Sequence, residues 1–302
     1  MKKLLLSFIG LVIIGLVGIF ILKTGNCGML QQQIPFELKG TVYYATGTEL
    51  ICFTFKTFPK MEIIKKGWVF GTLFSKKRQK MINLKNFRNL HMGLLSLSPD
   101  EDKVAFYSMK NKLGVIYLKE GKVEILAEDC KYAQPVWISN NELLYSKAVW
   151  KPTNEERDEY ITIDGPIIKI NINTKQKIEL GYKGIWLGAL SPNKQYVICT
   201  RNSSSWESCA IYLLHVPDMK LTKFARCPGL IITCFIWSPD GKYFIFKKSR
   251  HPLISLLHGA FDIQDLYVYS LEHKKAYCLI ENTSLFDGFW LEECIELEDY
   301  IV

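Results

Sequence analysis

The chain has 302 residues, of which 48% are hydrophobic, 13% aromatic and 23% charged. This composition supplies enough apolar side chains for a large core and excludes an intrinsically disordered chain. The formal net charge is +8, but no nucleic-acid-binding motif accompanies the excess of lysine and arginine. We therefore expect no nucleic-acid partner.

The first predicted element is the apolar segment 4–22, whose 19 residues carry no charge and follow Lys2 and Lys3. As a helix this segment would span about 29 Å, close to the thickness of a hydrocarbon core. A cleaved signal peptide usually has a shorter apolar region. We expect residues 1–30 to be a signal-anchor that crosses the membrane, followed by a juxtamembrane linker. Residues 31–302 then form one extracytoplasmic domain, in the bacterial periplasm or at the cell surface.

Two other fates of this segment stay open at the level of sequence. One is cleavage by a signal peptidase. The other is lipid attachment at Cys27, as in a bacterial lipoprotein, although Asn26 departs from the small apolar residues that usually precede such a cysteine. The retained anchor is the interpretation that the length of the apolar run favours.

A turn motif recurs four times after an apolar, strand-like run. In the best copy, Ser238-Pro239-Asp240-Gly241, proline presets the first turn angle, aspartate bonds the backbone and glycine supplies a positive φ. The other copies are Ser98-Pro99-Asp100, Ser191-Pro192-Asn193 and the weaker Ser139-Asn140-Asn141. The serines lie 41, 52 and 47 residues apart. A period of about 40–50 residues is typical of propeller blades with four strands.

The same order of apolar runs and polar turns follows each copy and predicts second, third and fourth strands. Residues 41–45, 50–55 and 61–64 also alternate like strands, whereas residues 285–302 contain only the beginning of a further unit. We expect the N-terminal strands to complete the last blade, because closure removes exposed sheet edges. The predicted fold is all-β: a single β-propeller of four-stranded blades, preceded by one N-terminal transmembrane helix. Six blades fit the length best, and five or seven are also compatible with it.

The repeated Ser-Pro-Asp-Gly-Lys turn resembles the WD-like propeller repeats of the TolB type. The resemblance covers roughly residues 93–281, and it is strongest at 234–246 and weakest at 134–146, where Asn140 and Asn141 replace proline and aspartate. It implies a propeller that interacts with other proteins and does not catalyse a reaction. A fold alone does not determine a function.

The sequence contains no catalytic constellation. It has no Gly-x-Ser-x-Gly elbow, no phosphate-binding glycine loop and no His-Glu-x-x-His, and its five histidines are scattered. Asp100 and Asp240 are explained by turn formation. We therefore expect no catalytic residue, no metal site and no cofactor.

The connections between second and third strands are the candidate functional elements, because three of them are long and share one face of the ring. They are residues 147–166, 201–209 and 247–264, and loops of such length are usually functional or disordered. We expect a protein or peptide partner to bind this face, and the candidate contact residues are Trp150, Trp206, Arg250, His251, Leu253, Leu256, Leu257 and His258. Leu253, Leu256 and Leu257 have helical spacing, so a short helix packed on the ring is the plainer interpretation of that segment.

Two other classes of function stay open. One is a propeller enzyme of the hydrolase or lactonase type, whose metal would be held by acidic or histidine side chains lining the central channel. The other is a sensor of carbohydrates or small ligands that uses aromatic loop residues.

Cysteine pairing is a separate question. Two pairs could form in an oxidising compartment, Cys199 with Cys209 and Cys227 with Cys234. Connectivity does not follow from sequence alone.

Overall fold

A computed structural model describes residues 34–45, 49–55, 61–66, 72–75, 80–84, 87, 92–108, 111–130, 134–154, 159–202, 208–228, 231–249, 264–283, 288–291 and 298–301. The regular elements of this part of the chain are β-strands, with no α-helix among them. Consequently no described helix is long and apolar enough to cross a membrane. The expected anchor, residues 4–22, lies outside the described residues.

Four sheets consist of four consecutive antiparallel strands each. The first contains β6 (Met92–Leu97), β7 (Lys103–Ser108), β8 (Lys112–Tyr117) and β9 (Lys122–Ala127). The second contains β10 (Val136–Trp137), β11 (Glu142–Asn154), β12 (Glu159–Asn171) and β13 (Lys177–Lys183). The third contains β14 (Trp186–Leu190), β15 (Tyr196–Asn202), β16 (Ser208–His215) and β17 (Lys220–Pro228). The fourth contains β18 (Ile231–Trp237), β19 (Tyr243–Ser249), β20 (Gln264–Ser270) and β21 (Lys275–Thr283).

The other two described sheets combine strands from both ends of the chain. One has the order β22-β1-β2-β3 and contains β1 (Thr41–Ala45), β2 (Glu49–Thr54), β3 (Met61–Lys66) and β22 (Gly288–Leu291). The other has the order β23-β5-β4 and contains β4 (Thr72–Ser75), β5 (Lys80–Asn83) and β23 (Glu298–Ile301).

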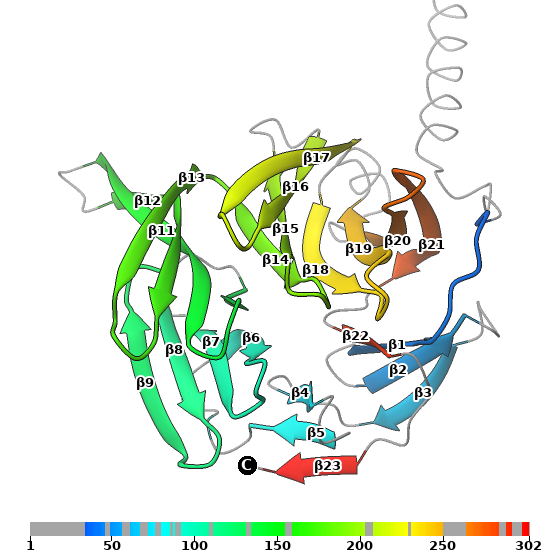
Figure 1. Ribbon diagram of the computed structural model, residues 1–302, viewed down its shortest axis with the longest axis horizontal. Coiled ribbons are helices and arrows are strands. Elements are labelled where there is room, and N and C mark those ends of the chain that lie inside the picture. The colour runs from blue at the N-terminus through cyan, green and yellow to red at the C-terminus, as the bar shows by residue number, and fades with distance from the viewer. Residues whose placement is uncertain are drawn as a thin grey trace, which may run out of the picture.

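The six described sheets stand in chain order around a common centre, as Figure 1 shows. The innermost strands contact their neighbours in the series β4, β6, β10, β14, β18 and β22. Radial sheets that follow one another in this way are the architecture of a β-propeller. The predicted all-β propeller with four-stranded sheets is confirmed at this level.

The termini meet as the sequence predicts, with one exception. β1 pairs antiparallel with β22, Val42 opposite Trp290 and Tyr43 opposite Phe289, so N-terminal strands do complete the last unit. The expectation that all of residues 285–302 belong to this unit is wrong for β23, which pairs in parallel with β5 of the next sheet. The reason is that β1 already occupies the edge of β22 that a second strand would need.

Alternating side chains on the strands pack against the sheet on either side. In β11, Leu143 and Tyr145 face a cluster shared with the β6–β9 sheet, whereas Leu144 faces a cluster shared with the β14–β17 sheet. In β19, Phe244 and Phe246 likewise face the β14–β17 sheet. This period of two is the strand geometry that the sequence pattern indicated. Each fully buried side chain of this size contributes about 1.5–3 kcal/mol.

Two tryptophans link neighbouring innermost strands through their indole nitrogens. Trp137 Nε1 donates to the carbonyl of Ser96 in β6 at 2.9 Å, and Trp237 Nε1 donates to the carbonyl of Ala189 in β14 at 3.1 Å. Each indole therefore buries its ring and satisfies its one polar atom at the same time. These bonds set the spacing of adjacent sheets near the ring centre.

The repeated turns join the first strand of a sheet to the second. In three copies the serine N–H donates to the carbonyl five residues later, as from Ser238 to Tyr243 at 2.9 Å. In the weak copy this bond runs from Ile138 to Glu142 at 3.0 Å, and Ile138 is buried as the three serines are. Ile138 thus takes the serine position. The alignment on Ser139 is wrong by one residue, because the turn there is one residue shorter.

The fourth position of the turn has a left-handed backbone. Gly241 has a φ of 69°, which confirms the expected role of this glycine, and the equivalent Lys194 has a φ of 59°. A Cβ at Gly241 would meet only Pro192 Cδ at 3.7 Å, an ordinary contact. Backbone conformation, and not crowding, therefore sets the cost of a side chain here.

We predict that Lys194→Gly stabilises the protein by about 0.5–1 kcal/mol. A left-handed non-glycine residue costs about 1–2 kcal/mol, and the extra freedom of glycine in the unfolded chain offsets part of that gain. The matched variant Gly241→Ala should destabilise by about 1 kcal/mol for the same reason. Chemical denaturation of the full chain measures both, and a Lys194→Gly variant less stable than wild type would contradict the prediction.

Candidate functional site

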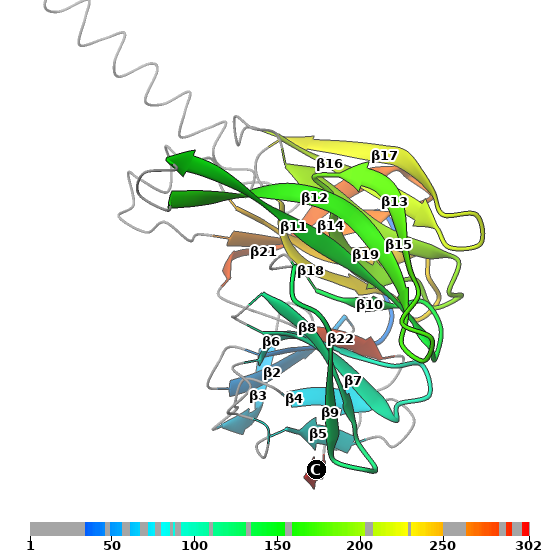
Figure 2. The same ribbon diagram turned by 90° about the vertical axis from the view of Figure 1, so that its left-hand side faces the viewer.

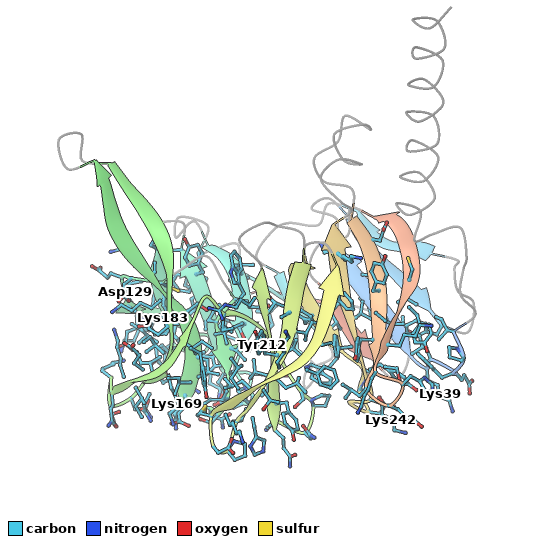
Figure 3. The ribbon with its side chains drawn as sticks, turned by 90° about the horizontal axis from the view of Figure 1, so that it is seen from above. Lys39, Asp129, Lys169, Lys183, Tyr212 and Lys242 are labelled. Carbon is cyan, nitrogen blue, oxygen red and sulfur yellow. The ribbon has the colours of Figure 1, made fainter. Side chains whose placement is uncertain are left out.

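The most prominent feature of the ring is a two-stranded arm formed by the far ends of β11 and β12, residues 148–154 and 159–164. Figures 2 and 3 show it extending beyond the neighbouring strands. The register pairs Val149 with Ile163 and Trp150 with Thr162. The expectation of a loop over 147–166 is therefore wrong, because β-branched residues on both sides of the acidic segment 155–158 favour strands.

The base of the arm is fixed on both sides. The Ala148 N–H donates to the carbonyl of Asp129 at 2.7 Å, and Lys147 Nζ lies 3.2 Å from a carboxylate oxygen of Asp129. On the other side Pro166 pairs with Lys183 at the end of β13. Register shifts occur at this level in both ladders, between Ser146 and Ala148 and between Pro166 and Ile168. Such bulges bend and twist a strand pair, which accounts for the changed direction of the arm.

Tyr145 and Ser146 anchor the arm in the ring interior. Ser146 Oγ donates to the carbonyl of Ile185 at 3.0 Å, across to the segment before β14. Burial and the neighbouring Asp129 carboxylate raise the pKa of Tyr145, so its phenol stays protonated. The base of the arm is thus held by buried, hydrogen-bonded groups of the ring.

The segment 150–165, which contains most of the arm together with residues 155–158 outside the described range, is acidic in a basic chain. Residues 150–165 contain two basic and five acidic residues, a net of −3 in a chain whose total is +8. The acidic residues are Glu155, Glu156, Asp158, Glu159 and Asp164.

The structure locates only part of the predicted partner face. Trp150 lies within strand β11, where it pairs with Thr162, and not in a loop. β15 ends at Asn202 and β16 begins at Ser208, and β19 ends at Ser249 while β20 begins at Gln264. The remaining candidates lie outside the described residues: Trp206, Arg250, His251, Leu253, Leu256, Leu257 and His258. Alternation around residues 155–158 was the signal that could have identified the arm from sequence.

The repeated turns lie at the opposite end of the ring. Figure 3 labels Lys242, in the turn between β18 and β19, on the side away from the arm. In this turn Ser238 Oγ donates to Asp240 Oδ1 at 2.6 Å and accepts from the Tyr243 N–H at 2.9 Å. Ser191 and Asn193 repeat the arrangement. These polar groups satisfy one another, which supports their structural role.

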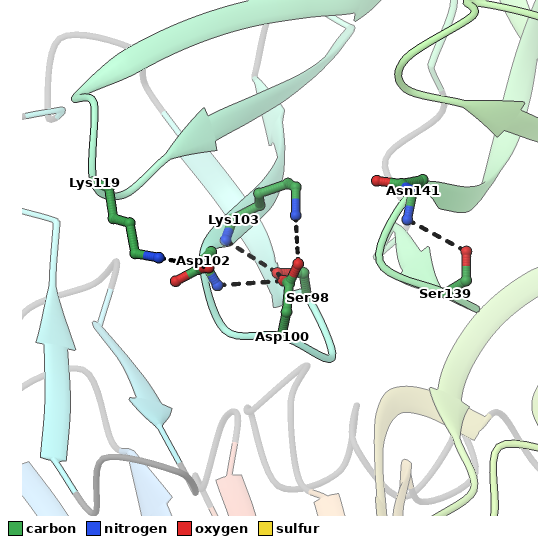
Figure 4. A network of polar contacts seen from close by, with 7 residues as sticks. All are labelled: Ser98, Asp100, Asp102, Lys103, Lys119, Ser139 and Asn141. Carbon is green, nitrogen blue, oxygen red and sulfur yellow. Dashed lines mark hydrogen bonds and ion pairs between the residues drawn. The ribbon is translucent and has the colours of Figure 1, made fainter.

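The turn at Ser98 has one additional charged partner. Lys103 Nζ lies 2.6 Å from Asp100 Oδ2, and the Lys103 N–H donates to Ser98 Oγ at 3.0 Å (Figure 4). Burial acts to raise the pKa of Asp100, but the Lys103 ammonium, the Ser98 hydroxyl and the Asp102 N–H together hold it below its ordinary value. Asp100 is therefore a charged turn residue.

The described residues contain no group of three or more His, Cys, Asp or Glu side chains that could hold a metal ion. One of the two expected cysteine pairs, Cys199 with Cys209, does not meet. Cys199 is opposite Tyr212 and Cys209 is opposite Asn202, so three residues of strand, about 10 Å, separate them. The expected Cys199–Cys209 pair is therefore wrong. Cys227 and Cys234 lie in different sheets, in β17 and β18.

No protein-family model matches the chain, and no curated protein matches it. Solved structures similar to it include TolB from Acinetobacter baumannii, 13% identical over 83% of this chain and 55% of that chain, with a TM-score of 0.46. Another is the putative TolB from Agrobacterium tumefaciens, 12% identical over 81% of both chains, with a TM-score of 0.47. The tricorn protease is 10% identical over 81% of this chain and 26% of that chain, with a TM-score of 0.46.

The chain is thus similar to TolB-type β-propeller proteins, as the turn motif indicated. It spans 55% of the length of the A. baumannii protein. At these identities and TM-scores the similarities say nothing about activity or partners. The assignment of the propeller rests on the strand topology.

We predict that Asp100→Asn destabilises the protein at neutral pH by about 1 kcal/mol, because it removes a charged hydrogen-bond acceptor. The lowered pKa means that this contribution is complete above the unfolded value of about 3.9 and is lost as the pH falls through the folded pKa. The two proteins should therefore become equally stable in acid. Unfolding measured at pH 7 and at low pH tests this.

The matched control is Asn193→Ala in the equivalent, uncharged turn. Its cost should not change over the same pH range. An Asp100→Asn cost that stays constant into acid would contradict the ionised role of Asp100.

Proposed function

We propose that the protein is a membrane-anchored, extracytoplasmic β-propeller of six blades that binds a protein or peptide partner and acts as a non-catalytic scaffold. The observation that carries the proposal is the arm of β11 and β12, which extends past the ring on the face away from the repeated turns. An isolated two-stranded ribbon is only marginally stable in water. A partner that packs on the arm would supply the missing contacts.

The other two connections on this face support the same interpretation. They leave the ends of β15 and β19 at the same end of the sheets as the arm leaves β11. Trp206 and the apolar series Leu253, Leu256 and Leu257 belong to these connections. Large apolar residues near the centre of an interface often provide most of its binding energy.

The proposed membrane attachment rests on the sequence. The 19 uncharged residues 4–22 follow two lysines, which favours an N-terminus in the cytoplasm and a propeller outside it. Residues 1–30 then serve as the anchor and linker, and residues 31–302 form the propeller domain.

Strand addition is the contact mode that the arm favours. β13 pairs with β12 only from Pro166 to Ile170, so no described strand pairs with the outer edge of residues 159–165. The opposite edge of the arm contains Pro152, which lacks a backbone N–H and blocks pairing. An extended peptide can therefore add to the edge of β12.

The charges of this edge indicate what kind of strand it takes. Glu159 and Asp164 lie at the two ends of the open stretch, so lysine or arginine opposite them would be favourable. The charges of this edge therefore favour a basic partner segment.

Removal of the arm tests the proposed face. We predict that replacing residues 149–163 by Asn-Gly, which joins the register partners Ala148 and Asp164 by a tight turn, lowers partner recovery at least about tenfold. The measurement is affinity purification of the tagged full chain from its native cells, with quantitative mass spectrometry. Thermal unfolding of the arm-less protein is the control, and a melting temperature equal to that of wild type shows that the ring is intact.

Point variants test the rest of the face, with Lys242→Ala on the turn face as the matched control. Trp206→Ala, and Leu256→Asp combined with Leu257→Asp, should each reduce recovery of the partner that wild type retains. Lys242→Ala should not. Full recovery by well-folded arm-less and point variants would rule this face out.

A further inference from the structure

Two cysteines lie directly opposite each other in the β16–β17 ladder. Cys209 pairs with Cys227, between the pairs Ser208–Pro228 and Ala210–Arg226. No other described strand pairing places one cysteine opposite another. This pair was not apparent from the sequence, because it depends on the register across the turn at 216–219.

The geometry of an antiparallel ladder suits a disulfide at this place. Residues directly opposite each other have Cα atoms about 4.5–5.5 Å apart, within the range of about 4.4–6.8 Å that disulfides span. The register around Cys209 is regular, since the described shift in this ladder lies further along, between Ile211 and Tyr212. The backbone register therefore places the two cysteines within the span of a disulfide.

The surroundings of Cys209 favour a protected bond. Its side chain is 1% exposed and belongs to the cluster that joins the β14–β17 and β18–β21 sheets. In the reduced state its thiol donates a weak bond to the carbonyl of Ala210 at 3.5 Å. A disulfide here would be shielded from dissolved reductants.

Two other buried cysteines serve as internal controls. Cys199 is opposite Tyr212, and Cys130 is opposite Lys147. They are as buried as Cys209 but have no cysteine opposite them in the described pairings, so they test whether register, and not burial, selects the pair.

We propose that Cys209 and Cys227 form a disulfide when the chain meets a disulfide oxidant, either glutathione disulfide or a dithiol oxidase. One cysteine thiolate attacks the oxidant's S–S bond and forms a mixed disulfide, and one oxidant thiol leaves. The second cysteine thiolate then attacks the mixed disulfide, the Sγ–Sγ bond forms and the second oxidant thiol leaves. The two protons and two electrons lost by the cysteines end on the reduced oxidant.

This inference is independent of the partner face, because Cys209 and Cys227 lie in another sheet from the arm. It bears on the proposed location, since structural disulfides persist in oxidising compartments and are rare in the cytosol. A bond between Cys209 in β16 and Cys227 in β17 would close a covalent loop around the turn of this hairpin. The bond would therefore restrict the unfolded chain and stabilise the sheet next to the arm.

Non-reducing peptide mapping tests the proposal. The purified full chain is fully reduced, freed of reductant, incubated with glutathione disulfide, quenched in acid, alkylated in denaturant and digested. We expect one dominant cross-linked peptide pair that contains Cys209 and Cys227, while Cys130 and Cys199 are recovered alkylated. Alkylation of both Cys209 and Cys227, or linkage of either to another cysteine as the main product, would overturn the proposal.

Thermal unfolding supplies a second readout. The oxidised wild type should unfold about 5 °C above the reduced protein. The variant Cys227→Ala should lose this difference between oxidised and reduced samples, whereas Cys199→Ala should keep it even though it lowers the stability of both states. An oxidation-dependent shift that survives in Cys227→Ala would also overturn the proposal.

Discussion

The pairing of β1 with β22 is the constraint on which the rest of the structure depends. It joins the first strand of the described chain to one of its last in a single antiparallel ladder, and without it the edge of β1 would be open to other chains. With this pairing, the innermost strands from β4 to β22 follow one another around the centre. The connections at each end of the sheets then gather on a common face.

The two faces differ in how their polar groups are satisfied. On the turn face, the hydroxyls of Ser98, Ser191 and Ser238 bond both the turn carboxylate or amide and the following strand, so short connections hold themselves in place. On the other face, one hairpin continues past the ring as the arm, and its outer β12 edge has no described partner. The turns on one side bond their own polar groups, whereas the other side has a strand edge without a described partner, and for this reason we propose the second face as the binding face.

Local patterns predicted the local structure. The alternation over 41–45 coincides with β1, and the Ser-Pro-Asp-Gly chemistry correctly places a positive φ at Gly241, because both depend on a few neighbouring residues. The errors of the sequence analysis concern strand register and the pairing of distant segments. No short window of sequence shows which strands meet. The pairing of β23, the one-residue offset at Ile138 and the cysteine opposite Cys209 all depend on that information. The arm was missed because the charges at 155–158 concealed the strand pattern around them. Of the partner-face candidates only Trp150 is located, and the others stay predictions.

Hydrogen–deuterium exchange tests the closure of the ring most directly. The full chain would be compared with a chain that ends at Thr283 and so lacks β22 and β23. If β22 closes the ring, the amides of Thr41–Ala45 should exchange at least about tenfold faster in the shortened chain, since they lose a hydrogen-bonding strand, while β11 and β12 within the ring keep their protection. Equal protection of Thr41–Ala45 in the two chains would contradict the closure.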